Sequence, residues 1–386
     1  MRVVWVGGYF PADKAHLDTL SEQVDITVYG ATNARSDLPF QPEPPSSCRS
    51  RVFQPVVSAK PLLYVYRGLS AALDADSPNV IHVVSEPWGT LAIQCARWVS
   101  RHPDTALVVH GCDTIWWHGP RVEQVARRRL ATMTLRRCAA YAAESSVAIS
   151  RARESGLGSL KPSAVIHTNP RDPLAFAPPK SPGAQLNAQR SLGLPTGGVG
   201  VGFIGRLVPE KGPTLLLDAF RVAEDQLEGV WLALAGSGDL ERDVRKRADD
   251  ENHRFLGALS YPDQVAEFYR SIDILVVPSW RTPDWEEQSP RSVIEGLLSG
   301  CTVVGADSGA IPEMLGGHGI VFPERDPRAL SKAILRAVAE HGRRKAGREW
   351  AISRYSAGAV AQQLLALWTQ ARRAPSTGDA ENLSSV

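Results

Sequence analysis

The chain has 386 residues, 43% of them hydrophobic and 22% charged, a composition typical of soluble globular proteins. This length exceeds one ordinary core and predicts two domains of about 150 to 200 residues each. The 43 basic and 41 acidic residues leave a net charge of +2, which excludes an overall basic field for nucleic-acid binding.

The N-terminus and the cysteines predict where the protein resides. The first apolar run is short and reaches Asp13 and Lys14 quickly, so it predicts a strand rather than a signal segment. The sequence has no stretch of about 18 apolar residues that could span a membrane. Five cysteines without a CxxC pair or zinc-type spacing are interpreted as free thiols in a reducing compartment. We therefore expect a cytoplasmic protein.

Short apolar runs alternate with longer helical patterns along the chain. The runs lie at residues 3–6, 80–84, 106–109, 147–149, 164–166, 199–204, 231–235, 272–277 and 302–304. Runs that are apolar on both faces and bounded by Gly, Pro or Ser are typical of buried parallel strands. Their alternation with helices predicts an α/β, doubly wound architecture.

The domain boundary is marked by a change in composition. Residues 170–198 carry six prolines and several glycines without a strong hydrophobic period. We therefore place the domains and their connections as follows: a Rossmann-like domain at 1–170, a linker region at 171–196, a second Rossmann-like domain at 197–350, a closing helix at 351–373 that packs back on the first domain, and a disordered tail at 374–386.

Two loops of the first half are rich in aromatic and acidic side chains. They contribute Glu86 and Trp88 after one predicted strand, and Asp113 and Trp116 after the next. Ligands of doubly wound folds bind at the carboxyl ends of the strands, so these four residues are candidates for an acceptor pocket. Packing within the domain is an equally good interpretation of the tryptophans.

A basic helical stretch follows at residues 121–137. It carries five arginines in two groups: Arg127, Arg128, Arg129, Arg136 and Arg137. We favour a solvated helix face. The alternative is a weak contact with a membrane surface, which would place the protein at the inner face of a membrane.

The second half contains a strand-to-helix loop with two cations. Gly205 ends an apolar strand, Arg206 and Lys211 follow, and an apolar helix begins after Gly212. Glycine permits a tight turn, and the two cations could neutralise a diphosphate. The alternative is a surface pair between Lys211 and Glu210.

A pair of glutamates flanks a predicted helix start. Ser289 is expected as N-cap and Pro290 at the first helical position, with Gly300 ending the helix. A helix N-terminus favours a phosphate. Glu287 would then lie just outside this N-terminus, and Glu295 would lie on its other side, six residues past the cap and about 9 Å from it along the helix axis. Alone, this spacing also fits a solvated loop acid and a helix-surface acid.

These segments, taken together, resemble the donor site of retaining GT-B glycosyltransferases of family 4, the glycosyl transferases group 1. The resemblance covers residues 197–345 and includes the loop from Gly205 to Gly212, the turn 235–239, the glutamate pair and residues 300–313. It implies two Rossmann-like domains facing a central cleft.

The resemblance also implies roles for individual residues. Arg206 and Lys211 would bind the donor phosphates, Glu287 the hydroxyls of the transferred sugar, and Glu295 the ribose. The other expected donor contacts are Gly7, Gly8, Gly205, Gly236, Leu259, Ser289, Pro290, Arg291 and Ser292. His110 resembles the family histidine near the transferred sugar, although a histidine that caps a strand end is an alternative. The family usually has Phe-Gly in place of Ser289-Pro290.

The resulting hypothesis is a metal-independent, retaining hexosyltransferase. It would move a sugar from a nucleotide-diphosphate donor, which serves as co-substrate, to a hydroxyl acceptor such as a glycan, a lipid-linked glycan or a small natural product, and it would need no other cofactor. The alternatives are a GT-B sugar-nucleotide epimerase, a glycosyl phosphorylase, or a non-catalytic protein that binds nucleotide sugars. A dinucleotide-dependent dehydrogenase is disfavoured because no G-x-G-x-x-G follows a strand.

Overall fold

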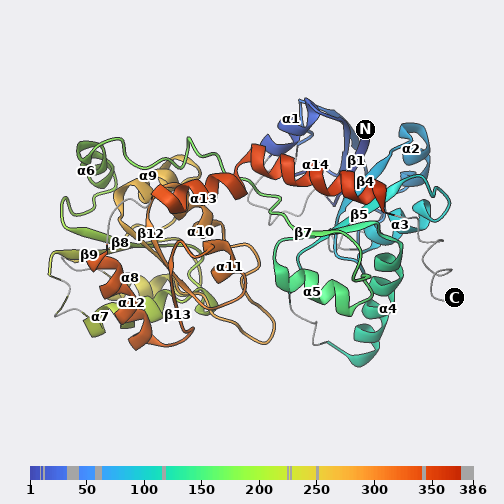
Figure 1. Cartoon of the computed structure of the whole chain (residues 1–386). Coiled ribbons are helices and arrows are strands. Elements are labelled where there is room, and N and C mark those ends of the chain that lie inside the picture. The colour runs from blue at the N-terminus through green and yellow to red at the C-terminus, as the bar shows by residue number, and fades with distance from the viewer. Residues whose placement is uncertain are drawn as a thin grey trace. The chain divides into compact units, whose positions relative to one another are not determined.

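A computed structural model of the chain describes residues 1–8, 10–11, 14–32, 43–56, 63–114, 119–223, 226, 228–248, 252–340 and 345–374. The chain divides into two compact units. Unit 1 consists of Met1–Pro170 and the described part of Ala357–Val386, and unit 2 is Arg171–Ser356. Each unit is built around one parallel sheet (Figure 1).

Unit 1 has a seven-stranded parallel sheet with the order β3-β2-β1-β4-β5-β6-β7. Its strands are β1 (Arg2–Gly7), β2 (Asp25–Gly30), β3 (Arg49–Val52), β4 (Val80–Val84), β5 (Ala106–Gly111), β6 (Ala140–Ala143) and β7 (Ser163–Val165). Its helices are α1 (Ala15–Ser21), α2 (Leu69–Asp76), α3 (Thr90–Val99), α4 (Arg121–Arg137), α5 (Ser146–Glu154) and α14 (Ala357–Arg373).

Both faces of this sheet are covered by helices. Along β1, Val3 and Trp5 belong to a core shared with α1 and α14, whereas Val4 and Val6 belong to the opposite core shared with α2, α3, α4 and α5. This alternation is the period of two that a strand imposes on its side chains. Figure 1 shows α14, in red, lying beside the blue α1.

Unit 2 has a six-stranded parallel sheet with the order β10-β9-β8-β11-β12-β13. Its strands are β8 (Val199–Ile204), β9 (Val230–Ala235), β10 (His253–Phe255), β11 (Ile274–Val277), β12 (Thr302–Ala306) and β13 (Ile320–Phe322). Its helices are α6 (Pro182–Ser191), α7 (Pro213–Ala223), α8 (Glu241–Arg247), α9 (Asp263–Ser271), α10 (Arg291–Leu298), α11 (Ile311–Leu315), α12 (Pro327–Ala339) and α13 (Lys345–Tyr355), with a 3-10 turn at Pro209–Lys211.

The two sheets confirm the predicted α/β, doubly wound fold class. In unit 2 the chain runs from β8 outward to β10 and returns to β11 on the other side of β8. The carboxyl ends of β8 and β11 therefore flank a topological switch point, where open α/β sheets bind ligands. Both of the second-half segments singled out from the sequence follow these two strands.

Three predicted elements differ from the structure. Residues 147–149 form part of helix α5 instead of a strand, because Ser145 caps this helix by accepting a hydrogen bond from the Ala148 N–H. The predicted linker contains helix α6, whose N-cap is Ser181 and whose first residue is Pro182. This helix packs against α9 and so belongs to unit 2.

The predicted closing helix at 351–373 is two helices, with the break between Tyr355 and Ala357. Their apolar side chains serve different cores: Tyr355 is buried in unit 2, whereas Trp368 is buried in unit 1. Of the predicted disordered tail, residues 375–386 lie outside the described part of the chain.

Candidate functional site

The loop after β8 is shaped by close backbone contacts with the end of β11. Gly212 has a φ of +73°, and a Cβ at this position would lie 2.3 Å from the carbonyl oxygen of Pro278. Only glycine combines this φ with so short an approach. The loop is thereby held against Pro278, the residue directly after β11.

Lys211 and Glu287 meet at this point, although 76 residues separate them in sequence. The Nζ of Lys211 donates to the Oε1 of Glu287 over 2.5 Å, and the Oγ of Ser279 donates to the same oxygen over 2.7 Å. Glu287 is 5% exposed, whereas 20% of the Lys211 side chain is exposed. The lysine Nζ also lies 4.8 Å from the ring centre of Trp285. A fixed cation therefore stands beside a fixed carboxylate at the switch point.

Arg206 provides a second cation in the same loop. Its side chain is 60% exposed, and its nearest acidic atom is the Oε1 of Glu210 at 3.8 Å. A pair at this distance on an exposed side chain contributes little to stability. The guanidinium can therefore turn toward an anionic ligand at little cost.

Backbone groups from the neighbouring strand ends complete this surface. The Gly236 N–H donates to the Gly257 carbonyl over 2.8 Å, and the Ala310 N–H donates to the Glu287 carbonyl over 2.8 Å. A Cβ on Gly236 would lie 1.8 Å from the Gly205 carbonyl oxygen. The segments after β8, β9 and β10 are therefore in contact with one another, and the segment after β12 contacts the Glu287 segment. Leu259 lies partly buried two residues after Gly257.

Helix α10 begins one residue later than predicted. Pro290 is the N-cap, with φ −68° and ψ 103°, and it lies outside the helical region of backbone space. The expected assignment of Ser289 as N-cap is therefore wrong, and Arg291 and Ser292 are the first two helical residues. At the other end, Gly300 has a φ of +76°, which confirms the predicted helix end.

Glu295 is buried inside unit 2 and is bound by protein groups on both oxygens. The Nε of Arg171 donates to its Oε1 over 2.9 Å, and the hydroxyl of Tyr269 donates to its Oε2 over 3.1 Å. Burial raises the pKa of Glu295, and the charge of Arg171 opposes this shift. Arg171 and Tyr269 were not anticipated, because partners 124 and 26 residues away leave no local pattern.

In unit 1, Glu86 lies against the end of β5. Its Oε1 accepts hydrogen bonds from the backbone N–H groups of Cys112 at 2.7 Å and Asp113 at 3.1 Å. Burial, reinforced by the nearby Asp113, raises the pKa of Glu86 to about 8. The Nε1 of Trp88 donates to the Oδ2 of Asp113 over 3.0 Å. Three of the four acceptor candidates are therefore neighbours, and Trp116 lies outside the described residues.

Within the described part of the chain, one group of side chains could hold a metal ion: Glu86, Cys112 and Asp113. One ligand atom from each of them lies within 4.8 Å of the other two. A metal needs a thiolate and ionised carboxylates. Burial raises the pKa of the Cys112 thiol well above its usual value and raises the pKa of both carboxyl groups. The group is therefore better suited to hydrogen bonding than to metal binding.

His110 lies on β5 and is only 3% exposed. Its Nδ1 is 3.2 Å from the Nε2 of His82, and its Nε2 is 3.7 Å from Glu144. Burial lowers the pKa of His110, while the charge of Glu144 opposes the shift. The Nε1 of Trp368 on α14 donates to the Nδ1 of His82 over 3.0 Å. The predicted catalytic histidine is thus part of a buried network beneath α14.

Gly7 and Gly8 follow β1 in the same unit. Both of their carbonyl oxygens accept hydrogen bonds from the Tyr66 hydroxyl, over 2.7 and 3.0 Å. The hydrogen bonds from Tyr66, which is distant in sequence, hold the Gly7–Gly8 loop in place.

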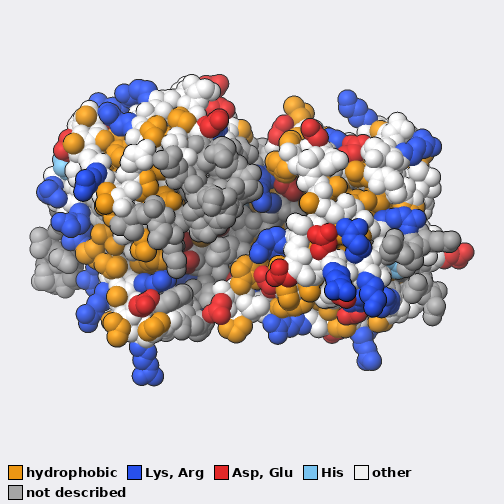
Figure 2. Space-filling model, turned by 180° about the vertical axis from the view of Figure 1, so that it is seen from behind, with side chains coloured by type: hydrophobic (Ala, Val, Ile, Leu, Met, Phe, Trp, Pro, Cys, Tyr) orange, Lys and Arg blue, Asp and Glu red, His pale blue; other side chains and the backbone are white. Residues whose placement is uncertain are grey.

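The arginines of α4 lie on a largely solvated helix. Residues 121–130 are exposed apart from the half-buried Arg127, whose Cζ lies 4.2 Å from the Trp88 ring centre. On the face shown in Figure 2, basic and acidic side chains of the described residues are interspersed. A search of the described helices finds none that is both long and apolar enough to cross a membrane.

Comparisons with known proteins place these observations in context. Residues 198–340 match the family model described as glycosyl transferases group 1. The chain is 27% identical over 244 residues to a D-inositol 3-phosphate glycosyltransferase of Corynebacterium urealyticum, which covers 59% of this chain and 56% of the relative. The chain spans about half the length of the curated relatives it matches.

Solved structures extend the likeness to the whole chain. A sucrose-phosphate synthase from Thermosynechococcus elongatus has a TM-score of 0.68 at 17% identity and covers 97% of this chain and 100% of its own. Anabaena HepE, solved with UDP and glucose, has a TM-score of 0.62 at 19% identity and covers 100% of both chains. At these identities the likeness shows the fold, which is that of GT-B proteins.

Proposed function

We propose that this protein is a retaining glycosyltransferase that uses a nucleotide-diphosphate sugar, because residues 198–340 match the group 1 glycosyltransferase model and the chain has the fold of GT-B proteins. The observation that carries the proposal is the contact between Lys211 and Glu287 at the switch point of unit 2, with Arg206 in the same loop. Cations and a sugar-binding carboxylate are what a diphosphate joined to a hexose requires. The Anabaena relative solved with UDP and glucose supports a donor of this kind.

In this proposal Lys211 and Arg206 neutralise the diphosphate, and Glu287 accepts hydrogen bonds from hydroxyls of the transferred sugar. The first-turn amides of Arg291 and Ser292 add the favourable potential of a helix N-terminus. Gly205, Gly236 and Leu259 line the nucleotide side. Because two cations and a helix end balance the leaving charge, no metal ion is needed.

Glu295 is proposed to hold the ribose. Arg171 and Tyr269 already donate hydrogen bonds to the two carboxylate oxygens of Glu295. Ribose hydroxyls would therefore either donate further hydrogen bonds to these oxygens or displace one of the two partners. The preformed contacts orient the carboxylate before the donor arrives, which is the usual benefit of preorganisation.

The chemical step keeps the configuration of the sugar. The bond between C1 and the diphosphate oxygen breaks, and the acceptor oxygen bonds to C1 on the same face. The acceptor proton passes to the leaving phosphate oxygen, so no protein nucleophile is required. His110 is proposed to lie near the transferred sugar together with Gly7 and Gly8, and the acceptor is proposed to bind unit 1 near Glu86, Trp88 and Asp113.

We also propose where the protein resides and what the arginine face of α4 contacts. The five cysteines are free thiols, which supports a cytoplasmic location. The arginines of α4 are proposed to form a solvated face, with a weak membrane-surface contact as the alternative.

Replacing Lys211 tests the proposal. Lys211→Ala removes a charge-assisted hydrogen bond worth about 1.5–3 kcal/mol, so we expect turnover to fall by about 10- to 150-fold. Transfer from UDP, GDP, ADP and dTDP sugars is measured by release of the nucleoside diphosphate. Lys332→Ala, which changes an exposed lysine on α12, should keep full turnover.

Four outcomes would count against this assignment. Near-normal turnover in Lys211→Ala would contradict the phosphate contact. Isomerisation of the donor without acceptor would indicate an epimerase, and a requirement for free phosphate would indicate a phosphorylase. Donor binding without any turnover would indicate a non-catalytic protein.

A further inference from the structure

The segment between β11 and Glu287 contains a narrow hairpin that ends at Trp285. The Thr282 N–H donates to the Trp285 carbonyl over 2.8 Å, and the two residues form an antiparallel bridge. Pro283 and Asp284 are the exposed tip between them. Proline is favoured at the second position of such a turn because its ring presets φ. The hairpin therefore fixes the backbone of Trp285 two residues before Glu287.

The base of this hairpin is tied to two neighbouring loops of unit 2. The Trp280 N–H donates to the Glu210 carbonyl over 2.9 Å, in the loop that carries Lys211. The N–H and the Nε of Arg281 donate to the two carboxylate oxygens of Glu324, over 2.7 and 3.0 Å. These hydrogen bonds hold the hairpin against the loops that follow β8 and β13.

Trp285 presents its ring to the ammonium group of Lys211. The Nζ lies 4.8 Å from the ring centre, within the distance at which a cation is attracted to an aromatic face. The same Nζ donates to the Oε1 of Glu287 over 2.5 Å. The ring is partly buried, and 20% of the Lys211 side chain is exposed. An ammonium group has three N–H donors, so these two partners leave donors for a ligand on the exposed side.

The ring and the carboxylate hold the ammonium group in different ways. Glu287 carries a negative charge, which attracts the lysine but also repels a diphosphate placed beside it. The Trp285 ring attracts the ammonium through its quadrupole and has no net charge. The flexible four-carbon stem of Lys211 is thus held by a second partner that does not compete with an anion. A lysine held in this way loses less conformational freedom when the ligand arrives.

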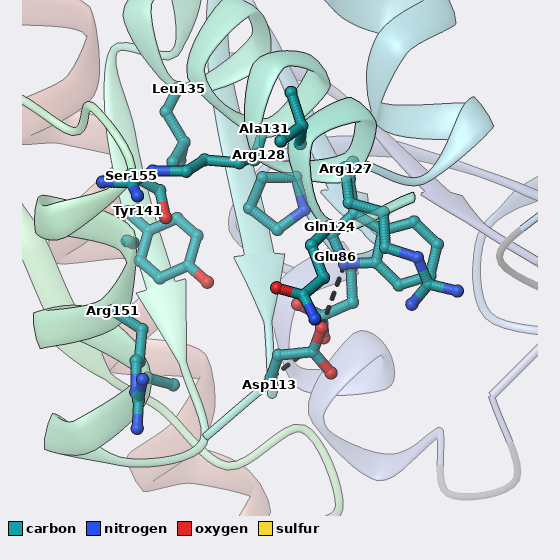
Figure 3. A pocket seen from close by; sticks show the side chains of 15 residues that line it. Glu86, Asp113, Gln124, Arg127, Arg128, Ala131, Leu135, Tyr141, Arg151 and Ser155 are labelled. Carbon is teal, nitrogen blue, oxygen red and sulfur yellow. Dashed lines mark hydrogen bonds between the residues drawn. The ribbon is translucent and has the colours of Figure 1, made fainter. Parts of the chain in front are cut away.

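Unit 1 contains another tryptophan beside a cation, and the comparison shows what is particular to Trp285. Arg127 and Asp113 both line a cavity of about 320 Å³ that is bounded by α4 and α5 (Figure 3). The Cζ of Arg127 lies 4.2 Å from the ring centre of Trp88, whose Nε1 donates to Asp113 over 3.0 Å. That indole is fixed by its own hydrogen bond within unit 1. The cation beside Trp285 instead binds the candidate sugar-binding carboxylate, so this ring acts on a group of the donor site.

We infer that Trp285 is a positioning residue of the donor site and that it acts through Lys211. The ring holds the ammonium group beside Glu287 before the donor binds, so that the diphosphate meets a cation already in place. Trp285 therefore contributes to affinity for the diphosphate group and not to affinity for the nucleoside. This inference rests on the proposed function, because it takes the diphosphate of the donor as the ligand of Lys211.

Binding of UDP, GDP, ADP and dTDP to the full chain tests the inference. Each is measured by calorimetry, and its nucleoside is measured by competition. Trp285→Leu should weaken the best-bound diphosphate by about fivefold or more and leave its nucleoside unchanged, because the aromatic face is lost. Trp285→Phe keeps an aromatic face and should restore most of the affinity. Trp280→Leu is the matched control: its ring lies in the same hairpin beside Arg325, at 5.7 Å, and its loss should change the affinity by less than about twofold.

A double-mutant cycle tests whether Trp285 acts through Lys211. In the Lys211→Met background, Trp285→Leu should weaken the diphosphate by less than about a further twofold, because the ring has no ammonium group to hold. A fivefold loss that persists in this background would overturn the inference, as would equal losses in Trp280→Leu and Trp285→Leu. Unchanged diphosphate affinity in Trp285→Leu would overturn it and leave the proposed function intact. Failure of the unmodified protein to bind any of the four diphosphates would contradict the proposed function and this inference with it.

Discussion

Two glutamates eight residues apart have different surroundings in the folded chain. Glu287 is paired with Lys211, whose side chain is one-fifth exposed, so a ligand can reach the pair. Glu295 is enclosed by Arg171 and Tyr269, with both partners buried. The difference arises because Glu287 lies in a strand-end loop and Glu295 on the inward side of α10. Residue type and spacing therefore predict which glutamates are candidate site residues, but not whether a ligand can reach them.

His16 gives a prediction for pH dependence at the residue scale. It is fully buried, and no hydrogen-bond partner of its ring nitrogens appears among the described residues. Burial lowers the pKa of His16 from 6.5 to about 4. Below pH 6.5 the unfolded chain therefore binds more protons than the folded one, and the free energy of unfolding falls with pH until about pH 4. The loss from this residue amounts to roughly 3 kcal/mol.

Denaturant unfolding between pH 7.5 and 4.5 measures this effect. His16→Leu should flatten the decline in the free energy of unfolding, because the uncharged side chain takes up no proton. His318→Leu, a change in a partly exposed histidine of unit 2, should keep the slope of the unmodified protein. A His16→Leu variant with an unchanged slope would contradict the explanation. Some slope should persist, because burial also lowers the pKa values of His82 and His110.

At the scale of elements, the pattern of apolar residues predicted most strands of both sheets. The strands that it missed were missed for identifiable reasons. Strand β6 is Ala-Tyr-Ala-Ala, which has little β propensity and depends on pairing with β5 and β7. Residues 147–149 are as apolar as a strand, but the N-cap Ser145, two residues before them, favours a helix. Short apolar segments are therefore assigned by tertiary pairing and capping more than by composition.

Helix α14 is expected to stabilise unit 1 although it comes last in the chain. Trp368 is fully buried, packs against His82 and donates to its Nδ1 over 3.0 Å. Trp368→Ala removes a large buried side chain and leaves His82 without that donor, so we expect a loss of about 3–5 kcal/mol in the free energy of unfolding. Gln370→Ala, an exposed change on the same helix, should cost less than about 0.5 kcal/mol. Equal stabilities of these two variants would contradict the assigned role of α14.

At the scale of the whole molecule, each unit has its own sheet and its own hydrophobic cores. We therefore expect two transitions in a calorimetric scan. A donor nucleotide sugar at 100 times its Kd should stabilise unit 2 by about 2.7 kcal/mol and so move one transition upward. Trp368→Ala should move the other transition downward. A donor effect on the transition that is sensitive to Trp368→Ala would contradict the placement of the donor site in unit 2.

The sequence by itself determined the fold class and the loops that carry the candidate donor site. Buried parallel strands need continuous apolar runs, and sharp strand-end turns need glycine, so both leave local patterns. The tertiary structure alone decided that Lys211 meets Glu287, that Arg171 and Tyr269 enclose Glu295, and that arginines of α4 and α5 share a cavity with Glu86. These pairings join residues distant in sequence, and their geometry follows from sheet order and helix packing, which no local pattern records.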